Sequence, residues 1–134
     1  MSASHAVSAM RKLTPVLTVD AIEPCLPFWV ERLEFAKTVE VPEGDRLGFV
    51  ILARDGVELM YQTKTSLEAD LSQPTAALTP SSFLFLEVAD LDAVEQAMRG
   101  VEPLIPRRTT FYGMDELVVR EPGGNVVIFA QPVK

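Results

Sequence analysis

The stretch EPGGNVVIFAQP, residues 121–132, joins a tight turn to an apolar segment. Pro122 fixes the backbone angle φ, and Gly123 and Gly124 permit the positive φ values of a hairpin turn. Residues 125–131 are almost wholly apolar, which favours a strand. The end of the chain is therefore predicted to be a turn followed by a strand.

The segments before this stretch complete a pattern of one strand, one helix and three strands. Residues 81–90 favour a strand. The helix that follows has Asp90 as its predicted N-cap and Gly100 as its stop. The three further strands are predicted at about 102–109, 114–120 and 125–131.

The same order of elements appears in the first half of the chain. A strand is predicted at 12–20, where Pro15 indicates an edge or an end of a sheet. Asp20 is the predicted cap of the next helix, with Glu23 as its capping-box partner. Three strands are then predicted at about 36–42, 47–54 and 57–63.

The chain therefore contains the βαβββ pattern twice. Val19 corresponds to Val88 at an offset of 69 residues, and Val57 to Val127 at an offset of 70. Such similar offsets indicate an internal duplication. Each half alone has too little core, so the halves must pair, within one chain or between two. We expect a flexible tail at 1–11, a first module at 12–63, a linker at 64–80 and a second module at 81–134.

The composition limits the classes of partner. The chain has 12 Lys and Arg against 19 Asp and Glu, a net charge of −7, which argues against nucleic acid. This charge is compatible with a cationic ligand, although many soluble proteins are acidic for solubility alone. No apolar run reaches the roughly 18 residues that span a bilayer, and the N-terminus lacks the apolar stretch of a signal peptide. We therefore expect a cytoplasmic protein with no membrane partner.

The helix of the first half is predicted to pack against the core. The single cysteine, Cys25, excludes an internal disulfide and a Cys-rich zinc site, and we expect it to be a partly buried helix residue. Four apolar residues are spaced for one buried helix face. They are Ile22, Leu26, Trp29 and Leu33.

Two stretches resemble the vicinal oxygen chelate superfamily, which includes glyoxalase I, extradiol dioxygenases and bleomycin-resistance proteins. They are LTPVLTVDAIEPCLPFWVERLEF (13–35) and YGMDELVVREPGGNVVIFAQP (112–132). Glu34 replaces a glycine that the family usually has, and Glu121 replaces an aspartate. The resemblance implies an α+β fold in which two βαβββ modules form a cupped eight-stranded mixed sheet, with the helices on its convex side.

The resemblance also implies where metal ligands would lie, because metal-dependent members place His or Glu on four strands of the cup. These positions fall on Thr14, Glu58, Phe83 and Ile128. Only Glu58 can bind a hard cation, and a catalytic metal needs about three protein ligands. The sole histidine, His5, is in the tail. We therefore expect no metal and no cofactor.

Strand alternation predicts which side chains face the cup. The residues on this face form an aromatic and apolar surface with two carboxylates, which suits a flat or amphipathic organic ligand. Glu58 or Glu87 would meet a positive group. The residues are Thr14, Val16, Thr18, Glu58, Met60, Gln62, Phe83, Phe85, Glu87, Val126, Ile128 and Ala130.

The predicted ligand-binding residues are a subset of this face together with one loop residue. Tyr112 lies in a loop before a strand and is a candidate lid. The sequence leaves open whether Glu116 points inward or outward, and whether the two phenylalanines pack in the core instead. The predicted set is Thr14, Thr18, Glu58, Met60, Phe83, Phe85, Glu87, Tyr112 and Ile128.

Three functions remain open at this point. The favoured hypothesis is a metal-free binding protein that resembles the bleomycin-resistance group and sequesters a cationic or aromatic drug or metabolite, giving antibiotic resistance, as a homodimer. The second is a lyase, isomerase or dioxygenase on the same scaffold. The third is a non-catalytic accessory module. The loss of the usual metal-ligand positions weighs against an enzyme.

Overall fold

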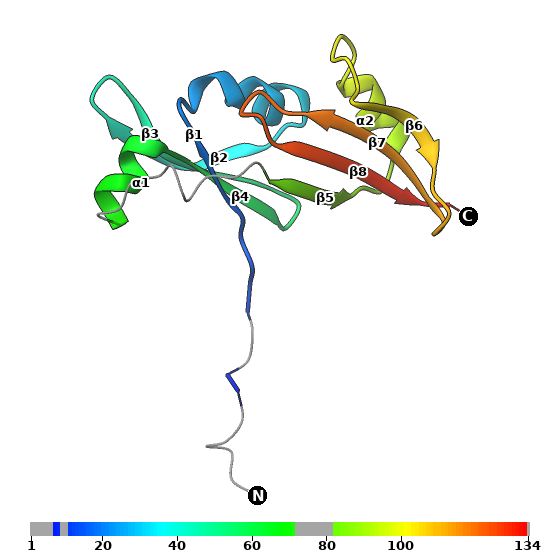
Figure 1. The fold of residues 1–134 in the computed structure, drawn as a ribbon, viewed down its shortest axis with the longest axis horizontal. Coiled ribbons are helices and arrows are strands. Elements are labelled where there is room, and N and C mark those ends of the chain that lie inside the picture. Colours follow the sequence, from blue (N-terminus) through cyan, green and yellow to red (C-terminus); the bar gives the residue numbers. More distant parts are fainter. Residues whose placement is uncertain (1–6, 9–10, 72–81, 134) are drawn as a thin grey trace, which may run out of the picture.

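The computed structural model describes residues 7–8, 11–71 and 82–133, which form two β-sheets with short helices (Figure 1). The first half contains β1 (Val16–Val19), the helices η2 (Glu23–Cys25) and η3 (Pro27–Arg32), β2 (Ala36–Glu43), β3 (Arg46–Arg54) and β4 (Val57–Thr63). The helix α1 (Lys64–Leu71) follows. The second half contains β5 (Phe83–Glu87), α2 (Leu91–Ala97), β6 (Ile105–Thr109), β7 (Met114–Arg120) and β8 (Val126–Pro132).

The first sheet has the strand order β1-β4-β3-β2. β1 runs parallel to β4, with Val16 opposite Met60. Pro15 stands just before β1, and its carbonyl accepts a hydrogen bond from the Met60 amide at 2.9 Å. The prediction that Pro15 marks a sheet edge is confirmed, because β1 is an edge strand.

The second sheet repeats this arrangement with the order β5-β8-β7-β6. β5 runs parallel to β8, with Phe83 opposite Val126. The Asp90 carboxylate accepts a hydrogen bond from the Ala93 amide at 3.3 Å, so the predicted cap of α2 is confirmed. The α+β class and the two βαβββ modules are therefore both confirmed.

The eight strands form two hydrogen-bonded sheets of four, where the sequence predicted one cupped sheet of eight. β1 and β2 are the edge strands of the first sheet, and β5 and β6 are those of the second. β1 begins directly after Pro15, which has no N–H group to offer a neighbouring strand. In Figure 1, η3 and α2 lie on the same, upper side of the two sheets. The opposite sheet faces are called the concave faces below.

The first helix begins later than predicted, and its predicted capping box is wrong. Ile22 precedes η2 and makes no side-chain capping bond. Asp20 instead pairs with Lys64, with 3.1 Å between the carboxylate and the ammonium. The Glu23 carboxylate accepts a hydrogen bond from the Leu47 amide at 2.6 Å, and this bond lowers the pKa of Glu23. The carboxylates of Asp20 and Glu23 therefore bond to other groups and do not cap the first helix.

One hydrophobic core joins the two modules on the helix side of the sheets. Trp29 is buried and packs edge to face against Phe28 and Phe35, each with ring centres 5.1 Å apart. Phe28 stacks on Phe129 of β8 at 6.4 Å. Aromatic pairs of this kind add to the stability gained from burial. The predicted helix face is confirmed by the buried Ile22 and Trp29 and the partly buried Leu26 and Leu33.

The turn between β7 and β8 also joins the modules, because it packs against β1. Gly124 has φ of +93°, as the turn prediction requires. Gly123 serves close packing instead, since a Cβ at this position would lie 2.7 Å from Cγ1 of Val19. The Asn125 amide donates to the Glu121 carboxylate at 2.5 Å and closes the turn.

A buried hydrogen-bond network links this turn to the first module. The Tyr61 hydroxyl donates to the Glu121 carboxylate and accepts from the Trp29 indole N–H at 2.8 Å. Burial raises the pKa of Tyr61 above its usual value. Burial also raises the pKa of the nearby Cys25 thiol to about 12. The predicted burial of Cys25 in the helical segment is confirmed.

The predicted tail and linker lie partly outside the described residues. Residues 1–6 and 9–10 of the tail and 72–80 of the linker are not described. The first eight linker residues form α1. Within the described parts of the chain, no helix has both the length and the apolar character needed to cross a membrane.

Candidate functional site

Strand register places the predicted polar side chains on the concave face of the first sheet. Leu17 and Val19 of β1 are buried in the core, so Val16 and Thr18 point the other way. Thr18 is opposite Gln62 in the β1–β4 pairing, and Met60 is opposite Val16. The face that was predicted from alternation is therefore the face that the helices leave open.

The concave face of the second sheet is aromatic and exposed. Phe83 and Phe85 are 73% and 54% exposed, whereas Phe129 on the opposite face of the same sheet is fully buried. Phe85 is opposite Ile128 in the β5–β8 pairing. The alternative that both β5 phenylalanines fill the core of this chain is therefore wrong.

A cavity of about 400 Å³ lies where the two sheets meet; we call it the seam cavity. It brings together three of the predicted ligand-binding residues, Glu58, Phe83 and Phe85, from both modules. Its volume is within the range of small-molecule sites. It is lined by Leu13, Pro15, Trp29, Gly56, Val57, Glu58, Leu59, Phe83, Leu84, Phe85 and Leu86.

Glu58 is the charged group of the seam cavity, and it already has partners. The Lys12 ammonium lies 2.5 Å from Oε1 of Glu58. The Thr14 hydroxyl donates to the same oxygen at 3.4 Å. The Glu58 side chain is partly exposed, so water screens this pair and the pair contributes little to stability. A ligand cation would replace Lys12 at this carboxylate.

A second carboxylate, Glu116 on β7, resolves the question that the sequence left open. Glu116 is opposite Ala130, which places it on the concave side, and it is only 2% exposed. The Tyr112 hydroxyl donates to one oxygen, and the Arg108 guanidinium lies 3.5 Å from the other. The bond to Glu116 raises the pKa of Tyr112. Tyr112 therefore contacts a carboxylate of the concave face, as a lid residue would.

No protein-family model matches the sequence, and neither does any curated protein. Solved structures do match. A glyoxalase/bleomycin resistance protein/dioxygenase from Nocardioides has a TM-score of 0.73 at 15% identity, over 98% of this chain and 89% of that one. The chain therefore has the same fold as this protein.

Two further vicinal oxygen chelate structures show the range of proteins with this fold. A bleomycin-binding protein from bleomycin-producing Streptomyces verticillus, solved with copper(II)-bleomycin, is 26% identical, with a TM-score of 0.64 over 92% of this chain and 97% of that one. A lactoylglutathione lyase from Agrobacterium tumefaciens is 14% identical, with a TM-score of 0.74 over 92% and 95%. The fold therefore occurs in both binding proteins and enzymes.

The residues at the metal positions that the resemblance implies do not fit a metal ion. Phe83 and Ile128 have no donor atoms, and Thr14 offers only a hydroxyl that bonds to Glu58. Glu58 is occupied by Lys12. Among the described residues, three or more His, Cys, Asp or Glu side chains nowhere gather in a way that could hold a metal.

The other predicted site residues are dispersed. Glu87 does not line the seam cavity, and it lines a different cavity on the helix side. The remaining predicted residues line neither of these two cavities; they are Thr14, Thr18, Met60, Tyr112 and Ile128. Glu116 was not in the predicted set. The sequence left the direction of Glu116 open, and its burial depends on Tyr112 and Arg108 from neighbouring segments.

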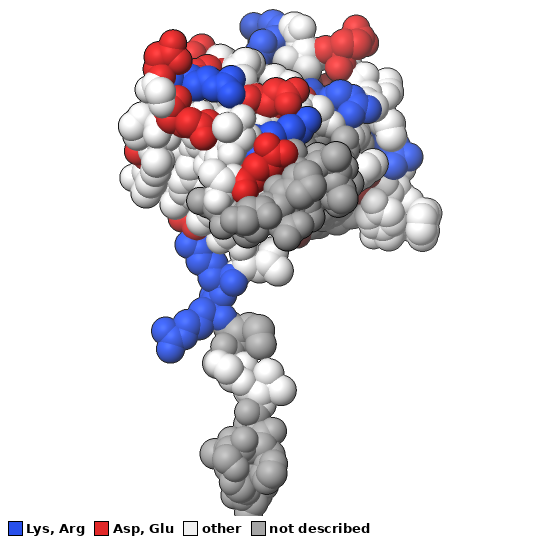
Figure 2. Space-filling view, turned by 60° about the vertical axis from the view of Figure 1, so that its left-hand side comes forward, with Lys and Arg blue, Asp and Glu red and all other residues white. Residues whose placement is uncertain are grey.

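Charged side chains of both signs are interspersed on the face of the molecule in Figure 2. Among the described residues, several charged side chains form ion pairs, such as Arg107 with Asp92 and Arg54 with Glu34. This face therefore has no broad patch of one sign. The negative net charge of the chain would attract a cation over a distance.

Proposed function

We propose that the protein binds a cationic or aromatic small molecule at its concave faces, without a metal, and so sequesters it. The observation that carries this proposal is the seam cavity, where the exposed Phe83 and Phe85 lie beside Glu58. Aromatic faces bind flat rings and cations, and a carboxylate beside them favours a cation.

We further propose that the working form is a homodimer. Phe83, Phe85 and Val16 expose large apolar surface on the concave faces of the single chain. Exposed apolar surfaces of this kind mark interaction sites. A second copy that covers these faces would turn an open surface into an enclosed ligand site. The interface would bury more than about 1,000 Å².

The affinity for such a ligand would have two physical parts. Stacking on Phe83 and Phe85 is nearly independent of salt. Attraction to Glu58 weakens with salt, but only in part, because a recessed charge pair is screened less than an exposed one. The ratio of the affinities at low and high salt therefore separates the two contributions.

The direct test is a calorimetric titration of bleomycin, a cationic glycopeptide, into the full chain in the presence of EDTA. We expect saturable binding by the wild type, and losses in Phe83→Ala and in Glu58→Gln. Leu104→Ala is a matched control, because Leu104 is also exposed but does not line the seam cavity. Wild-type binding that is unchanged in both site variants would place the site elsewhere. Absence of wild-type binding would remove the support for this class of ligand.

The metal-free part of the proposal has its own test. Elemental analysis after mild dialysis should find well below one equivalent of zinc, nickel, iron or manganese per chain. About one equivalent of any of these metals would contradict the proposal. A glyoxalase assay on the same sample tests the enzyme hypothesis. Turnover of the glyoxalase substrate would favour the alternative that the protein is a lyase.

A further inference from the structure

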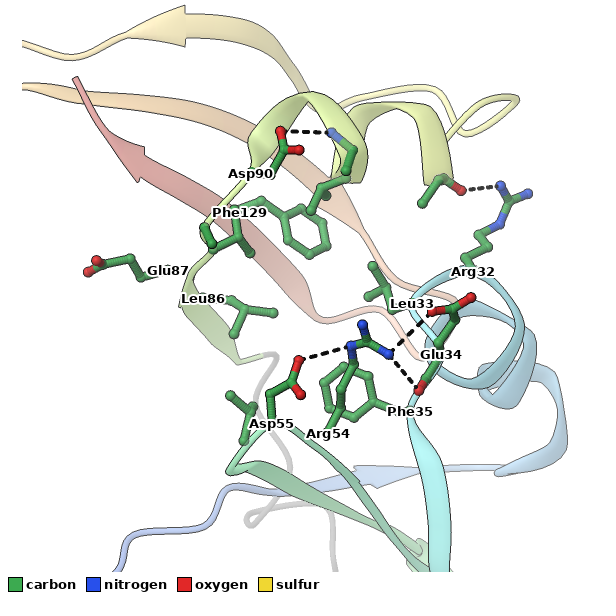
Figure 3. A pocket seen from close by; sticks show the side chains of 16 residues that line it. Arg32, Leu33, Glu34, Phe35, Arg54, Asp55, Leu86, Glu87, Asp90 and Phe129 are labelled. Carbon is green, nitrogen blue, oxygen red and sulfur yellow. Dashed lines mark hydrogen bonds and ion pairs between the residues drawn. The ribbon is translucent and has the colours of Figure 1, made fainter. Parts of the chain in front are cut away.

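A larger cavity, of about 530 Å³, lies on the helix side of the junction between the modules; we call it the rear cavity (Figure 3). It shares only Val57 and Leu86 with the seam cavity, so the two cavities lie back to back across this pair. The end of η3 and the β3–β4 turn form one wall. The end of β5 and α2 form the other.

The floor of the rear cavity is apolar. Phe35 and Phe129 are buried beneath it, and Leu33, Leu86 and Val94 are only partly buried. In Figure 3, Leu33, Leu86 and Phe129 converge on the same space. Partly buried apolar side chains around an open volume gain free energy when a ligand removes them from water. The floor therefore favours an apolar ligand body.

The polar group that projects over this floor is Arg54. Its Nη1 lies 3.3 Å from the Glu34 carboxylate, and its Nε lies 3.3 Å from the Asp55 carboxylate. These carboxylates are 75% and 81% exposed, so both pairs are weak. In the described parts of the chain, Nη2 of Arg54 makes no bond that the structure records. A ligand acceptor can therefore bond to Arg54 without displacing either carboxylate.

The backbone is also unusual beside Arg54, at the edge of the rear cavity. Glu34 and Asp55 have φ of +61° and +52°, and they are the non-glycine residues with positive φ in the described chain. Glycine would occupy these positions with less strain. Instead, each position carries a carboxylate that contacts Arg54. Both carboxylates therefore lie beside the guanidinium at the edge of the apolar floor.

The charges of the lining disfavour an anion, and Arg54 disfavours a cation that lies directly against its guanidinium. Arg32 and Arg54 are the cations of the lining, and Arg32 is already bonded to the Ala97 and Arg99 carbonyls at 3.1 and 2.9 Å. The lining also has four carboxylates, which repel an anion. The Arg54 guanidinium in the centre repels a cation. The acidic side chains of the lining are Glu34, Asp55, Glu87 and Asp90.

From these observations we propose that the rear cavity is a second binding site, for a neutral and largely apolar molecule that carries one carbonyl or hydroxyl acceptor. The apolar body contacts the floor, and the acceptor oxygen takes a hydrogen bond from Arg54. The site differs from the concave-face site in its position, in its lining and in the charge of its ligand. The proposal of this second site does not depend on the proposed function.

The test uses three probes with the same phenylalkyl body and different end groups. They are the neutral ketone 4-phenylbutan-2-one, the cation 4-phenylbutylamine and the anion 4-phenylbutyrate. We expect the ketone to shift the amide resonances of residues 33–35, 54–57 and 86–94 in a saturable way. The amine and the acid should bind at least about threefold more weakly, because each meets a like charge.

Two variants locate the site. Ala93→Phe places a ring in the mouth of the cavity from the exposed face of α2 and should abolish the saturable shifts. Gln96→Phe is the matched control on the same helix outside the lining and should bind as the wild type does.

Arg54→Met tests the hydrogen bond to the ligand, because it keeps the apolar stem and removes the donor. It should weaken ketone binding about threefold and strengthen amine binding.

Several outcomes would overturn the proposal. They are tighter binding of the amine or the acid than of the ketone, shifts confined to residues 13–15 and 83–85, unchanged binding in Ala93→Phe, or no saturable binding of the three probes. The bleomycin titration should be unaffected by Ala93→Phe. If Ala93→Phe loses bleomycin binding while the wild type still binds the ketone, the result would count against the concave-face site and not against the rear cavity.

Discussion

The two modules follow the same backbone plan but carry different chemistry on their concave faces. The first module presents Thr18, Glu58 and Gln62 there. The second presents Phe83, Phe85 and Ile128. The helix-side faces, in contrast, are both apolar and share one core. The packing faces of the two modules are therefore alike, whereas exposed aromatic rings occur on the open face of the second module alone among the described strands.

The largest expected effect separates the two faces of the second sheet. Phe129→Ala should destabilise the protein by about 3–5 kcal/mol, because Phe129 is fully buried and stacks on Phe28. Phe85→Ala, in the neighbouring strand, should change the stability of the monomer by less than about 0.5 kcal/mol. Urea unfolding at low protein concentration measures both. A similar loss in the two variants would show that the concave face is packed in the monomer.

The next effect concerns the bond that joins the modules. Tyr61→Phe leaves a buried Glu121 oxygen and the Trp29 N–H without their partner, and should cost about 2–3 kcal/mol. Thr109→Val removes a hydroxyl from an exposed bond to Asp115 and serves as the control. If Tyr61→Phe costs no more than the control, the modules are held together by apolar packing alone.

The two turn glycines should respond in different ways. Gly123→Ala places a Cβ 2.7 Å from Val19 of the other module and should cost about 1–3 kcal/mol. Gly124→Ala meets no atom within 4 Å but has a positive φ, so it should cost about 1 kcal/mol. Comparing the two melting temperatures separates contact between modules from local strain. A larger loss in Gly124→Ala would contradict the proposed role of Gly123.

Cys25 has no counterpart in the second module and gives a pH test. Burial raises the pKa of its thiol to about 12, whereas an unfolded thiol titrates near 8.5. The folded state therefore holds a proton that the unfolded state loses above about pH 8.5. Stability should be unaffected below this pH and should fall by about 1–2 kcal/mol between pH 8 and pH 10. Urea midpoints should show a flatter pH profile in Cys25→Ala, and equal slopes would refute the assignment.

The smallest expected effect is at the polar concave face. Glu58→Gln removes a partly exposed pair with Lys12 and should change stability by about 0–1 kcal/mol, less at high salt. The same variant should weaken the binding of a cationic ligand. A stability loss above about 2 kcal/mol would instead make Glu58 a structural residue.

The sequence predicted the elements of the fold well, because their signals are local. Strand alternation, the turn glycines and the Asp90 cap depend on neighbouring residues, and the structure confirms them. The Asp20 cap was wrong because the helix begins at Glu23 with Ile22 at the N-cap position, two residues after Asp20. The division into two sheets also depends on how the modules pack, which no local pattern encodes.

The site was predicted less completely for the same reason. Residues Glu58, Phe83 and Phe85 were found because alternation places them on one face. Glu116 was missed because its burial depends on Tyr112 and Arg108 from neighbouring segments. The rear cavity could not be predicted, since its walls come from five separate elements and loops that only tertiary packing brings together.

The most direct test of the account is an NMR shift map of the full chain titrated with bleomycin in the presence of EDTA. If the concave faces form the ligand site, the largest saturable shifts will fall on residues 14–16, 58–60 and 83–85 of both modules. Shifts restricted to one module, shifts restricted to the rear cavity, or a spectrum that does not change would contradict it.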